Sequence, residues 1–314
     1  MPEGALELCA SFHLIVSTEQ AFKRKQRNHK FSTDRPDFLA GCRDLSSSVT
    51  PHLQSGNAMH DLEISVISLR SAEQRRQYMV EQLSASPLRW SLFDALTGPH
   101  PDTPYSEQLA IIHNQSPLTK GELGCFGSHF ACMAEFVEKN TARYRLIIED
   151  DVYLDPTFWF TRLPTLMEAC GLDYLRLYSR ALPTVKVIAP LGQRHLIRLG
   201  KGPNGTQAYV ISQAGARAFL ASVQQISRPV DKELDRYWYN GLAPYAIYPY
   251  PALEFESQTT VKKSFGAAGT ASPMQRIERF LVRSREKIRR EQVDRALKGR
   301  DLQVAHAARQ WWSA

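Results

Sequence analysis

Three consecutive acidic side chains follow directly after an apolar segment. In YRLIIEDDVYLDP, residues 144–156, the apolar residues run into Glu149, Asp150 and Asp151. Side chains alternate along a strand, so Glu149 and Asp151 should point one way and Asp150 the other, as far as the extended conformation lasts. Two converging carboxylates repel each other unless a cation lies between them. Hard oxygen ligands suit Mg²⁺ or Mn²⁺, so we expect a metal at Glu149 and Asp151 that neutralises a leaving diphosphate.

An isolated acidic triplet is more often a solvated turn than a metal site, because acidic side chains are usually exposed. In that alternative, Asp155 and Pro156 would simply begin the next helix. The triplet lies where ligands of open α/β sheets collect, beyond the carboxyl end of a strand, but this position alone does not outweigh the solvated turn.

The apolar pattern predicts an α/β fold with a mostly parallel sheet flanked by helices. Residues 61–69 form a near-continuous apolar run, which is typical of a strand buried on both faces. Ser71 and Gln74 occupy the positions of a capping box for the next helix, and residues 89–96 predict a second, parallel strand. Later helices alternate with short apolar strands in the same way.

A second capping box, Thr119 with Glu122, predicts the helix that leads to the acidic strand. Its spacing places Cys125, His129, Cys132 and Phe136 on one face, so His129 is either a hydrogen-bonded core histidine or a site residue. Residues 97–118 are rich in Pro, Gly and Thr and predict a long surface loop that borders a site.

The composition indicates a soluble globular protein. The chain has 314 residues, of which 43% are hydrophobic, enough for one large domain or two modest ones. No stretch approaches the roughly 18 apolar residues of a membrane-spanning helix, and no secretory signal precedes the first strand, so we expect a cytoplasmic protein. The five cysteines include no CxxC pair, which favours reduced thiols and argues against a zinc site.

Several motifs together resemble glycosyltransferase family 25, the bacterial lipopolysaccharide and lipooligosaccharide sugar transferases. The segments that carry the resemblance are ISVISLRSAEQRR, FDALTG, LTKGELGCFGSH, LIIEDDVYL, GTQAYVISQAGARAFL and RPVDKELD, in the order of the family, over residues 61–262. The resemblance implies a GT-A-like nucleotide-sugar-binding fold, with the acidic triplet as its metal-binding motif. Phe126 and Gly127 depart from the family pattern.

The resemblance also implies roles for individual residues. A guanidinium on the first helix can bind phosphate in a forked geometry, and Arg75 and Arg76 cannot both face it because adjacent helical residues point in different directions. The residues expected to bind the nucleotide are Ser68, Leu69, Arg75, Arg76, Asp94, Ala95, Ser128, His129 and Asp150. For Asp94, a turn-capping role is the alternative.

Asp231 is the expected catalytic base, together with Asp151 as a catalytic residue of the metal site. An inverting transferase needs a carboxylate that takes the proton of the acceptor hydroxyl. The alternative is that Asp231 is only the N-cap of the helix DKELDRYWYN, where the helix dipole would also weaken it as a base.

The C-terminal segment, residues 263–314, predicts a basic amphipathic tail. Ten Lys and Arg and four Asp and Glu lie between Arg276 and Arg300, and this excess of six accounts for most of the net charge of +7. Apolar residues gather near one side of the predicted helix, namely Ile277, Phe280, Leu281 and Ile288. Such a helix suits an anionic membrane surface, although nucleic-acid binding or a solvated helix fits the charge as well.

These observations predict a loosely structured extension at residues 1–60, a transferase domain at 61–262 and the basic tail. The expected activity is the inverting transfer of a sugar from a UDP-sugar to a lipid-linked lipopolysaccharide core saccharide, and it depends on Mn²⁺ or Mg²⁺. Galactose is the expected sugar. The transfer would take place at the inner face of the bacterial inner membrane. The alternatives are an inactive nucleotide-binding regulator and a nucleic-acid-binding protein that uses the tail.

Overall fold

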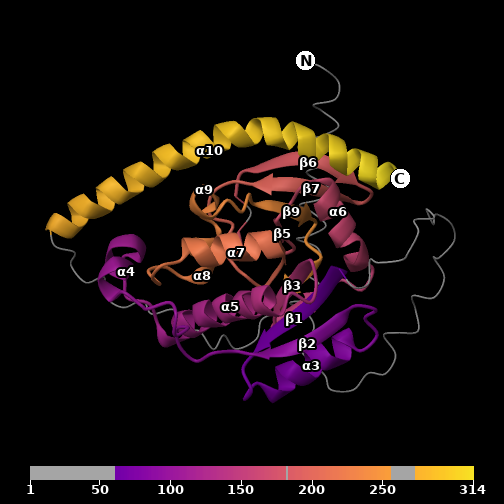
Figure 1. The fold of residues 1–314 in the computed structure, drawn as a ribbon, viewed down its shortest axis with the longest axis horizontal. Helices are drawn as coiled ribbons and strands as arrows, with labels where there is room; N and C mark the ends of the chain where they lie inside the picture. Colours follow the sequence, from indigo (N-terminus) through magenta and orange to yellow (C-terminus); the bar gives the residue numbers. More distant parts are fainter. Residues whose placement is uncertain (1–60, 182, 256–272) are drawn as a thin grey trace. The chain divides into compact units, whose positions relative to one another are not determined.

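The computed structural model describes residues 61–181, 183–255 and 273–314. The predicted extension at residues 1–60 lies outside the described residues, and so do residues 256–272, where the predicted transferase domain was expected to end and the tail to begin. Figure 1 shows a central sheet with helices on both sides and the long helix α10 along one edge.

The main sheet has eight strands in the order β2-β1-β3-β8-β5-β9-β7-β6. Its strands are β1 (Leu62–Ser68), β2 (Arg89–Asp94), β3 (Tyr144–Glu149), β5 (Tyr174–Arg176), β6 (Val185–Leu191), β7 (Arg194–Leu199), β8 (Ala208–Ser212) and β9 (Tyr245–Tyr248). A second sheet pairs β4 (Val152–Leu154) with β10 (Ala252–Glu254) in antiparallel fashion. Both predicted strands of the first βαβ unit are therefore present.

Two apolar cores, one on each face of the sheet, hold the helices in place. Along β3, Leu146 and Ile148 belong to the first core and Ile147 to the second, as the alternation of a strand requires. The first core includes side chains of α3 (Glu73–Leu83), α6 (Leu163–Ala169), α9 (Tyr237–Asn240) and α10 (Pro273–Ser313), with the short 3₁₀ helix η2 (Phe160–Arg162) beside it. The second includes side chains of α4 (Glu107–Asn114), α5 (Lys120–Lys139), α7 (Gln213–Ser222) and α8 (Val230–Leu234).

The predicted α/β class, with helices flanking a large sheet, is confirmed. The sheet itself is mixed. Parallel pairs join β1 to β2, β1 to β3 and β5 to β9, whereas the pairs β3–β8, β5–β8, β7–β9 and β6–β7 are antiparallel. Among these antiparallel pairs, β6–β7 joins consecutive strands through a short hairpin turn, which needs no crossover helix.

The local predictions had different outcomes. The capping box of Thr119 and Glu122 is confirmed at the start of α5. The prediction that Ser71 caps α3 was wrong, because Ala72 is the N-cap and no side chain caps this helix. The expected loop at residues 97–118 contains α4, whose N-terminus is capped by the Ser106 side chain.

Helix α5 lies directly against the chain that leaves β2. A Cβ on Gly124 would come within 2.7 Å of the carbonyl oxygen of Leu96, and one on Gly127 would meet the carbonyl oxygen of Gly98. The hydroxyl of Ser128 accepts a hydrogen bond from the Leu96 amide at 2.8 Å and donates one to the Gly124 carbonyl at 2.6 Å. Gly127, a departure from the family pattern, thus sits where only a glycine allows this close approach.

We predict that Gly127→Ala destabilises the protein by about 1–3 kcal/mol, because the new methyl group is forced against backbone that cannot turn aside. Urea unfolding should show a lower midpoint with an unchanged slope.

Gly299→Ala is the matched control, because Gly299 also lies in a helix but has open space around its Cβ position. Alanine there should stabilise the protein by roughly 0.5–1 kcal/mol through its helix propensity. Equal stability changes for the two variants would contradict the packing argument.

Candidate functional site

A cavity of about 850 Å³ lies at the carboxyl ends of β1 and β3 and extends past the end of β2. Its other walls are the first turns of α5, the connection that precedes β8 and the start of α8. The sequence-predicted residues that line it are Ser68, Leu69, Arg75, Ala95, Ser128, His129, Glu149, Asp150, Asp151 and Asp231. Residues from six elements or their connections therefore meet at one end of the sheet.

The acidic triplet lies where the sequence predicted, but the strand ends earlier than the alternation argument assumed. β3 ends at Glu149, and Asp150 and Asp151 form the turn into β4. Asp150 accepts a hydrogen bond from Ser68 at 2.5 Å and pairs with Arg75 at 3.1 Å. Glu149 instead accepts from Thr206 at 2.6 Å and lies 3.3 Å from His129 Nε2. All three carboxylates line the cavity, but their partners lie in different directions.

Among the three carboxylates of the triplet, Asp151 has the least compensation of its charge by hydrogen bonds or ion pairs. Its Oδ1 atom is buried and has no hydrogen-bond partner among the described residues. Burial, followed by repulsion from Glu149 and Glu254, raises the pKa of Asp151 to about 8. Burial also opposes the ionisation of Glu149, but hydrogen bonds from His129 and Thr206 still lower its pKa. An unpartnered oxygen beside a second carboxylate fits a cation ligand, so the residues present suit the predicted metal.

The first-helix arginines separate as adjacent helical residues must. Arg75 lines the cavity, whereas Arg76 turns to Asp94 and to the carbonyl of Ser68, 3.2 Å away. Hydrogen bonds from Arg70 and Arg76 lower the pKa of Asp94. Among the described residues, neither Arg76 nor Asp94 lines the cavity, so their ion pair stabilises the edge of the cavity instead.

His129 is completely buried and has a partner at each ring nitrogen. Nδ1 lies 2.8 Å from the hydroxyl of Tyr209, and Nε2 faces Glu149. Ser128 holds the Leu96 backbone against α5, so its hydroxyl positions the cavity wall. The histidine orients the end of the acidic strand, which satisfies both roles left open by the sequence.

Asp231 lines the cavity from the first turn of α8. The N-cap alternative is wrong, because Pro229 is the N-cap of α8 and Asp231 lies in its first turn. The Asp231 carboxylate accepts hydrogen bonds from the backbone amides of Gly205, at 3.2 Å, and Lys232, at 2.8 Å. These two amides fix its orientation toward the connection that precedes β8.

Arg180, Glu254 and residues 204–207 also line the cavity, although their sequence pattern did not predict a place in the site. Glu254 accepts hydrogen bonds from Tyr178 at 2.5 Å and Gln207 at 3.3 Å, and it pairs with Arg180 at 2.9 Å. Pairing of β10 with β4 brings Glu254 next to the acidic turn. The segment GTQ, at 205–207, was part of the family resemblance and could have indicated this wall.

Arg176 is the buried support of the connection 204–207. Its guanidinium pairs with Asp235 at 2.6 Å, donates to the carbonyl of Asn204 at 2.8 Å and also reaches the carbonyl of Gly205. Asp235 in turn accepts from the Asn204 amide at 3.0 Å. Asn204 and Gly205 both have positive φ, of 52° and 78°. Successive left-handed residues are costly for Asn, so the ion pair stabilises a conformation that the chain would not otherwise keep.

Comparisons with known proteins agree on one family. The model of glycosyltransferase family 25 (LPS biosynthesis protein) matches residues 61–234. The rat "Probable inactive glycosyltransferase 25 family member 3" is 33% identical over 187 residues, which cover 55% of this chain and 32% of that protein. The chain therefore spans about a third of the length of such relatives.

Two further relatives carry names that state an activity or a pathway. "Procollagen galactosyltransferase 1-A" of Xenopus laevis is 29% identical over 206 residues, covering 61% of this chain and 33% of that protein. "Lipooligosaccharide biosynthesis protein lex-1" of Haemophilus influenzae is 27% identical over 259 residues, covering 69% of this chain and 84% of that protein. The alignment with the Haemophilus protein thus extends over most of that relative.

We predict that Arg176→Met lowers the free energy of unfolding by about 3–5 kcal/mol, because it leaves Asp235 buried without its partner. The double variant Arg176→Met/Asp235→Asn should lose less than the sum of the two single changes, since the uncompensated charge is gone. Urea unfolding measures both. Arg217→Met, at an exposed position of α7, should change stability by less than about 0.5 kcal/mol. A purely additive double variant would contradict the coupling.

Proposed function

The chain belongs to glycosyltransferase family 25, and we propose that it transfers a sugar from a UDP-sugar to a lipopolysaccharide or lipooligosaccharide core saccharide. Galactose is the sugar that we propose. The observation that carries this proposal is the cavity, which is lined both by the acidic turn after β3 and by Asp231. The names of the Haemophilus and Xenopus relatives support the acceptor and the sugar, respectively.

The donor fits the half of the cavity formed by the ends of β1 and β2. Ser68, Leu69 and Ala95 line this half, which is where nucleotides bind in α/β folds with a switch in strand order. Arg75 lies between this half and the acidic turn, so its guanidinium is placed to meet a diphosphate while it keeps its pair with Asp150.

Glu149 and Asp151 would hold the Mn²⁺ or Mg²⁺ ion. When bound, such an ion supplies positive charge that stabilises the departing diphosphate. The unpartnered Oδ1 of Asp151 and the mutual repulsion of the carboxylates support this assignment. Asp150 is less suited to the ion, because Ser68 and Arg75 already compensate its charge.

Asp231 is the residue that we assign as the base. In an inverting transfer, the acceptor hydroxyl forms a bond to the anomeric carbon as the bond to the diphosphate breaks, and Asp231 takes the hydroxyl proton. The amides of Gly205 and Lys232 hold the carboxylate in one orientation. The short helix α8, residues Val230–Leu234, offers only a small dipole to weaken the base.

The inactive-regulator alternative has one point in its favour, since the rat relative is named as probably inactive. This chain nevertheless has both the acidic turn and Asp231 in the lining of one cavity, and these are the carboxylates that the proposed transfer needs. UDP binding without turnover of any UDP-sugar would favour the regulator.

We predict that UDP-sugar hydrolysis requires a divalent ion and falls by roughly 10²–10³-fold in Asp151→Asn, the size typical of losing one group that stabilises developing charge. A panel of UDP-sugars, measured with Mn²⁺ and with EDTA, tests both points. Asp102→Asn is the control, because Asp102 is 81% exposed and lies outside the cavity lining. Activity that survives both EDTA and Asp151→Asn would rule out the metal role.

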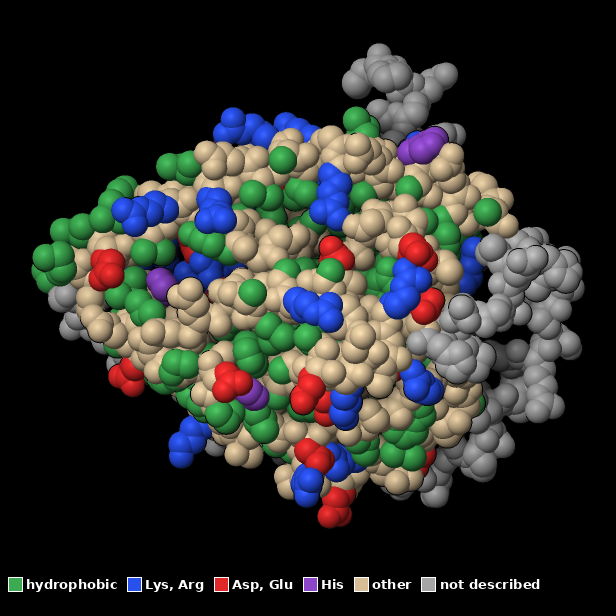
Figure 2. All heavy atoms as spheres, viewed as in Figure 1, with side chains coloured by type: hydrophobic (Ala, Val, Ile, Leu, Met, Phe, Trp, Pro, Cys, Tyr) green, Lys and Arg blue, Asp and Glu red, His purple; other side chains and the backbone are tan. Residues whose placement is uncertain are grey.

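The second part of the proposal concerns where the protein acts, and it rests on the exposed residues of α10. The described residues contain no helix that is long and apolar enough to cross a membrane. Large hydrophobic side chains are nevertheless exposed along α10, namely Met274, Ile277, Phe280, Leu281, Ile288 and Leu302. Figure 2 shows hydrophobic side chains gathered at the end of the molecule where α10 begins, with Lys and Arg beside them.

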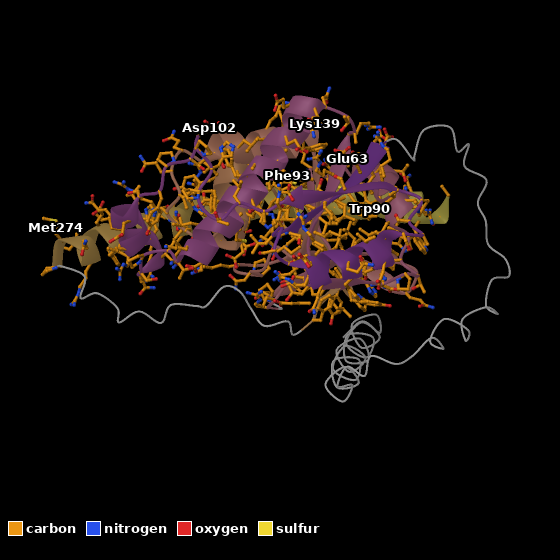
Figure 3. All side chains as sticks on the ribbon, turned by 90° about the horizontal axis from the view of Figure 1, so that it is seen from below. Glu63, Trp90, Phe93, Asp102, Lys139 and Met274 are labelled. Carbon is orange, nitrogen blue, oxygen red and sulfur yellow. The ribbon has the colours of Figure 1, made fainter. Side chains whose placement is uncertain are left out.

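The exposed apolar residues in the first half of α10 point away from the body because the opposite face of this half is fastened to it. Arg279 donates to the carbonyls of Ile111, at 2.9 Å, and Ile112, at 3.2 Å. Glu286 pairs with Arg228 at 2.9 Å and Arg236 at 3.0 Å. Residues 277, 281 and 288 share a helix face that lies nearly opposite to 279 and 286 at about 100° per residue. Met274 projects at the far end of the helix (Figure 3).

We name the exposed side of α10 that carries Met274, Ile277, Phe280, Leu281 and Ile288 the outer face. It combines exposed apolar side chains with arginines and lysine on its flanks, which is the pattern of helices that lie in an anionic membrane interface. A nucleic acid would use the charge but would leave Phe280 and Leu281 in water. We therefore propose that the outer face binds the lipid surface that holds the acceptor.

Vesicle co-sedimentation tests the outer face. The protein should bind vesicles that contain phosphatidylglycerol and not those of phosphatidylcholine alone, and Phe280→Ser should weaken binding by about tenfold through loss of buried apolar area. Leu302→Ser is the matched control, because Leu302 is 73% exposed on the same helix, beyond the outer face. Equal effects of the two changes, or tight binding to nucleic acid without vesicle binding, would contradict the proposal.

A further inference from the structure

Three side chains of different chemistry meet at the inner wall of the cavity. The thiol of Cys125, the imidazole of His129 and the carboxylate of Glu149 have ligand atoms that all lie within 4.8 Å of one another. Cys125 and His129 are four residues apart on α5, so they share one face of the helix. Glu149 comes from the end of β3. The proposed sugar transfer uses Glu149 as a ligand for Mn²⁺ or Mg²⁺ and assigns no function to Cys125.

The ligand types of this cluster differ from those of the acidic turn. Mg²⁺ and Mn²⁺ prefer carboxylate and phosphate oxygens, whereas thiolate and imidazole select Zn²⁺ and ions like it. Three protein ligands with one open position form the usual arrangement of an accessible zinc site. We propose that Cys125, His129 and Glu149 form a binding site for a Zn²⁺-class ion, with its fourth position open to the cavity.

The neighbours of the three ligands hold them in the orientation that such a site needs. The hydroxyl of Tyr209, on β8, lies 2.8 Å from His129 Nδ1, and this contact leaves Nε2 directed at Glu149, 3.3 Å away. A ligating histidine commonly uses its second ring nitrogen in this way. Thr206 donates to Glu149 at 2.6 Å and fixes the carboxylate from the opposite wall. The imidazole is therefore held before any ion binds.

The competing interpretation is a hydrogen-bonded core histidine beside an ordinary buried thiol. Cys132 provides the comparison, because it lies two turns further along α5 and is fully buried. Its neighbour is the Arg145 guanidinium, which lies 3.9 Å from its sulfur, and it does not line the cavity. Cys125 differs because it lines the cavity between a histidine and a carboxylate. The absence of a CxxC pair argued against zinc, but here the ligands come from two elements.

The shared ligand has a consequence for the transfer reaction. Glu149 is a ligand in both assignments, so a Zn²⁺-class ion bound there competes with the hard cation for its negative charge and should oppose activation by Mn²⁺. This consequence rests on the proposed function. The binding of the ion does not, because it is measured without any sugar donor.

Cobalt is the probe, since Co²⁺ takes the same ligands and reports a thiolate by a sulfur-to-cobalt charge-transfer band. The full-length protein, kept reduced, should bind Co²⁺ with this band and release it when Zn²⁺ is added. Cys125→Ser should abolish the band and weaken Co²⁺ binding by more than the roughly 10–100-fold typical of losing an outer partner. Cys132→Ser should leave both unchanged.

A second variant guards against a folding artefact. His129→Gln keeps a polar side chain beside Tyr209 but removes the imidazole ligand, so the charge-transfer band should weaken while far-ultraviolet circular dichroism stays native. If wild-type protein shows no thiolate band with Co²⁺, or if the band persists in Cys125→Ser, the site does not exist. Loss of sugar transfer with an intact cobalt band would instead count against the proposed function alone.

Discussion

Repulsion among closely spaced, partly buried carboxylates is the constraint around which the site is built. Glu149, Asp150, Asp151 and Glu254 line one cavity. Isolated charges are costly to bury, so each must gain a partner, lose its charge or bind a cation. Asp150 has Arg75, Glu149 has His129 and Thr206, and Glu254 has Arg180. These partners come from α3, α5, the segment after β5 and the connection before β8, so the site depends on segments that are far apart in the chain.

The connection 204–207 shows how one irregular segment solves several of these problems at once. Thr206 donates a hydrogen bond to Glu149, Gln207 donates one to Glu254, and the Gly205 amide donates one to Asp231. The same backbone turns its carbonyls inward to Arg176, so amides and carbonyls face charges of the appropriate sign. All of these contacts depend on the backbone conformation of residues 204–207, so a shift of this segment would disturb them together.

The sequence predicted what depends on neighbouring residues and missed what depends on distant ones. The strands β1 and β3, the capping box of α5 and the position of the acidic turn follow from patterns of a few residues. Ser71 failed as a cap because the turn before α3 places Ala72 at the helix start. The helix α4 was missed because the Pro, Gly and Thr around it dominated, although Ser106 has the character of a cap.

Other site features had no local signal at all. The sequence left open which of Arg75 and Arg76 faces the nucleotide, and the choice depends on Asp94, which belongs to another strand. Glu254 enters the cavity only because β10 pairs with β4, about a hundred residues earlier in the chain. The outer face of α10 adjoins this site through α4: Arg279 holds the last turn of α4, and Asn114 at its end bonds Lys232 at 2.7 Å. Asn114 and Lys232 both line the cavity next to Asp231, so a lipid surface bound by the outer face would lie on the side from which a lipid-linked acceptor must approach its base.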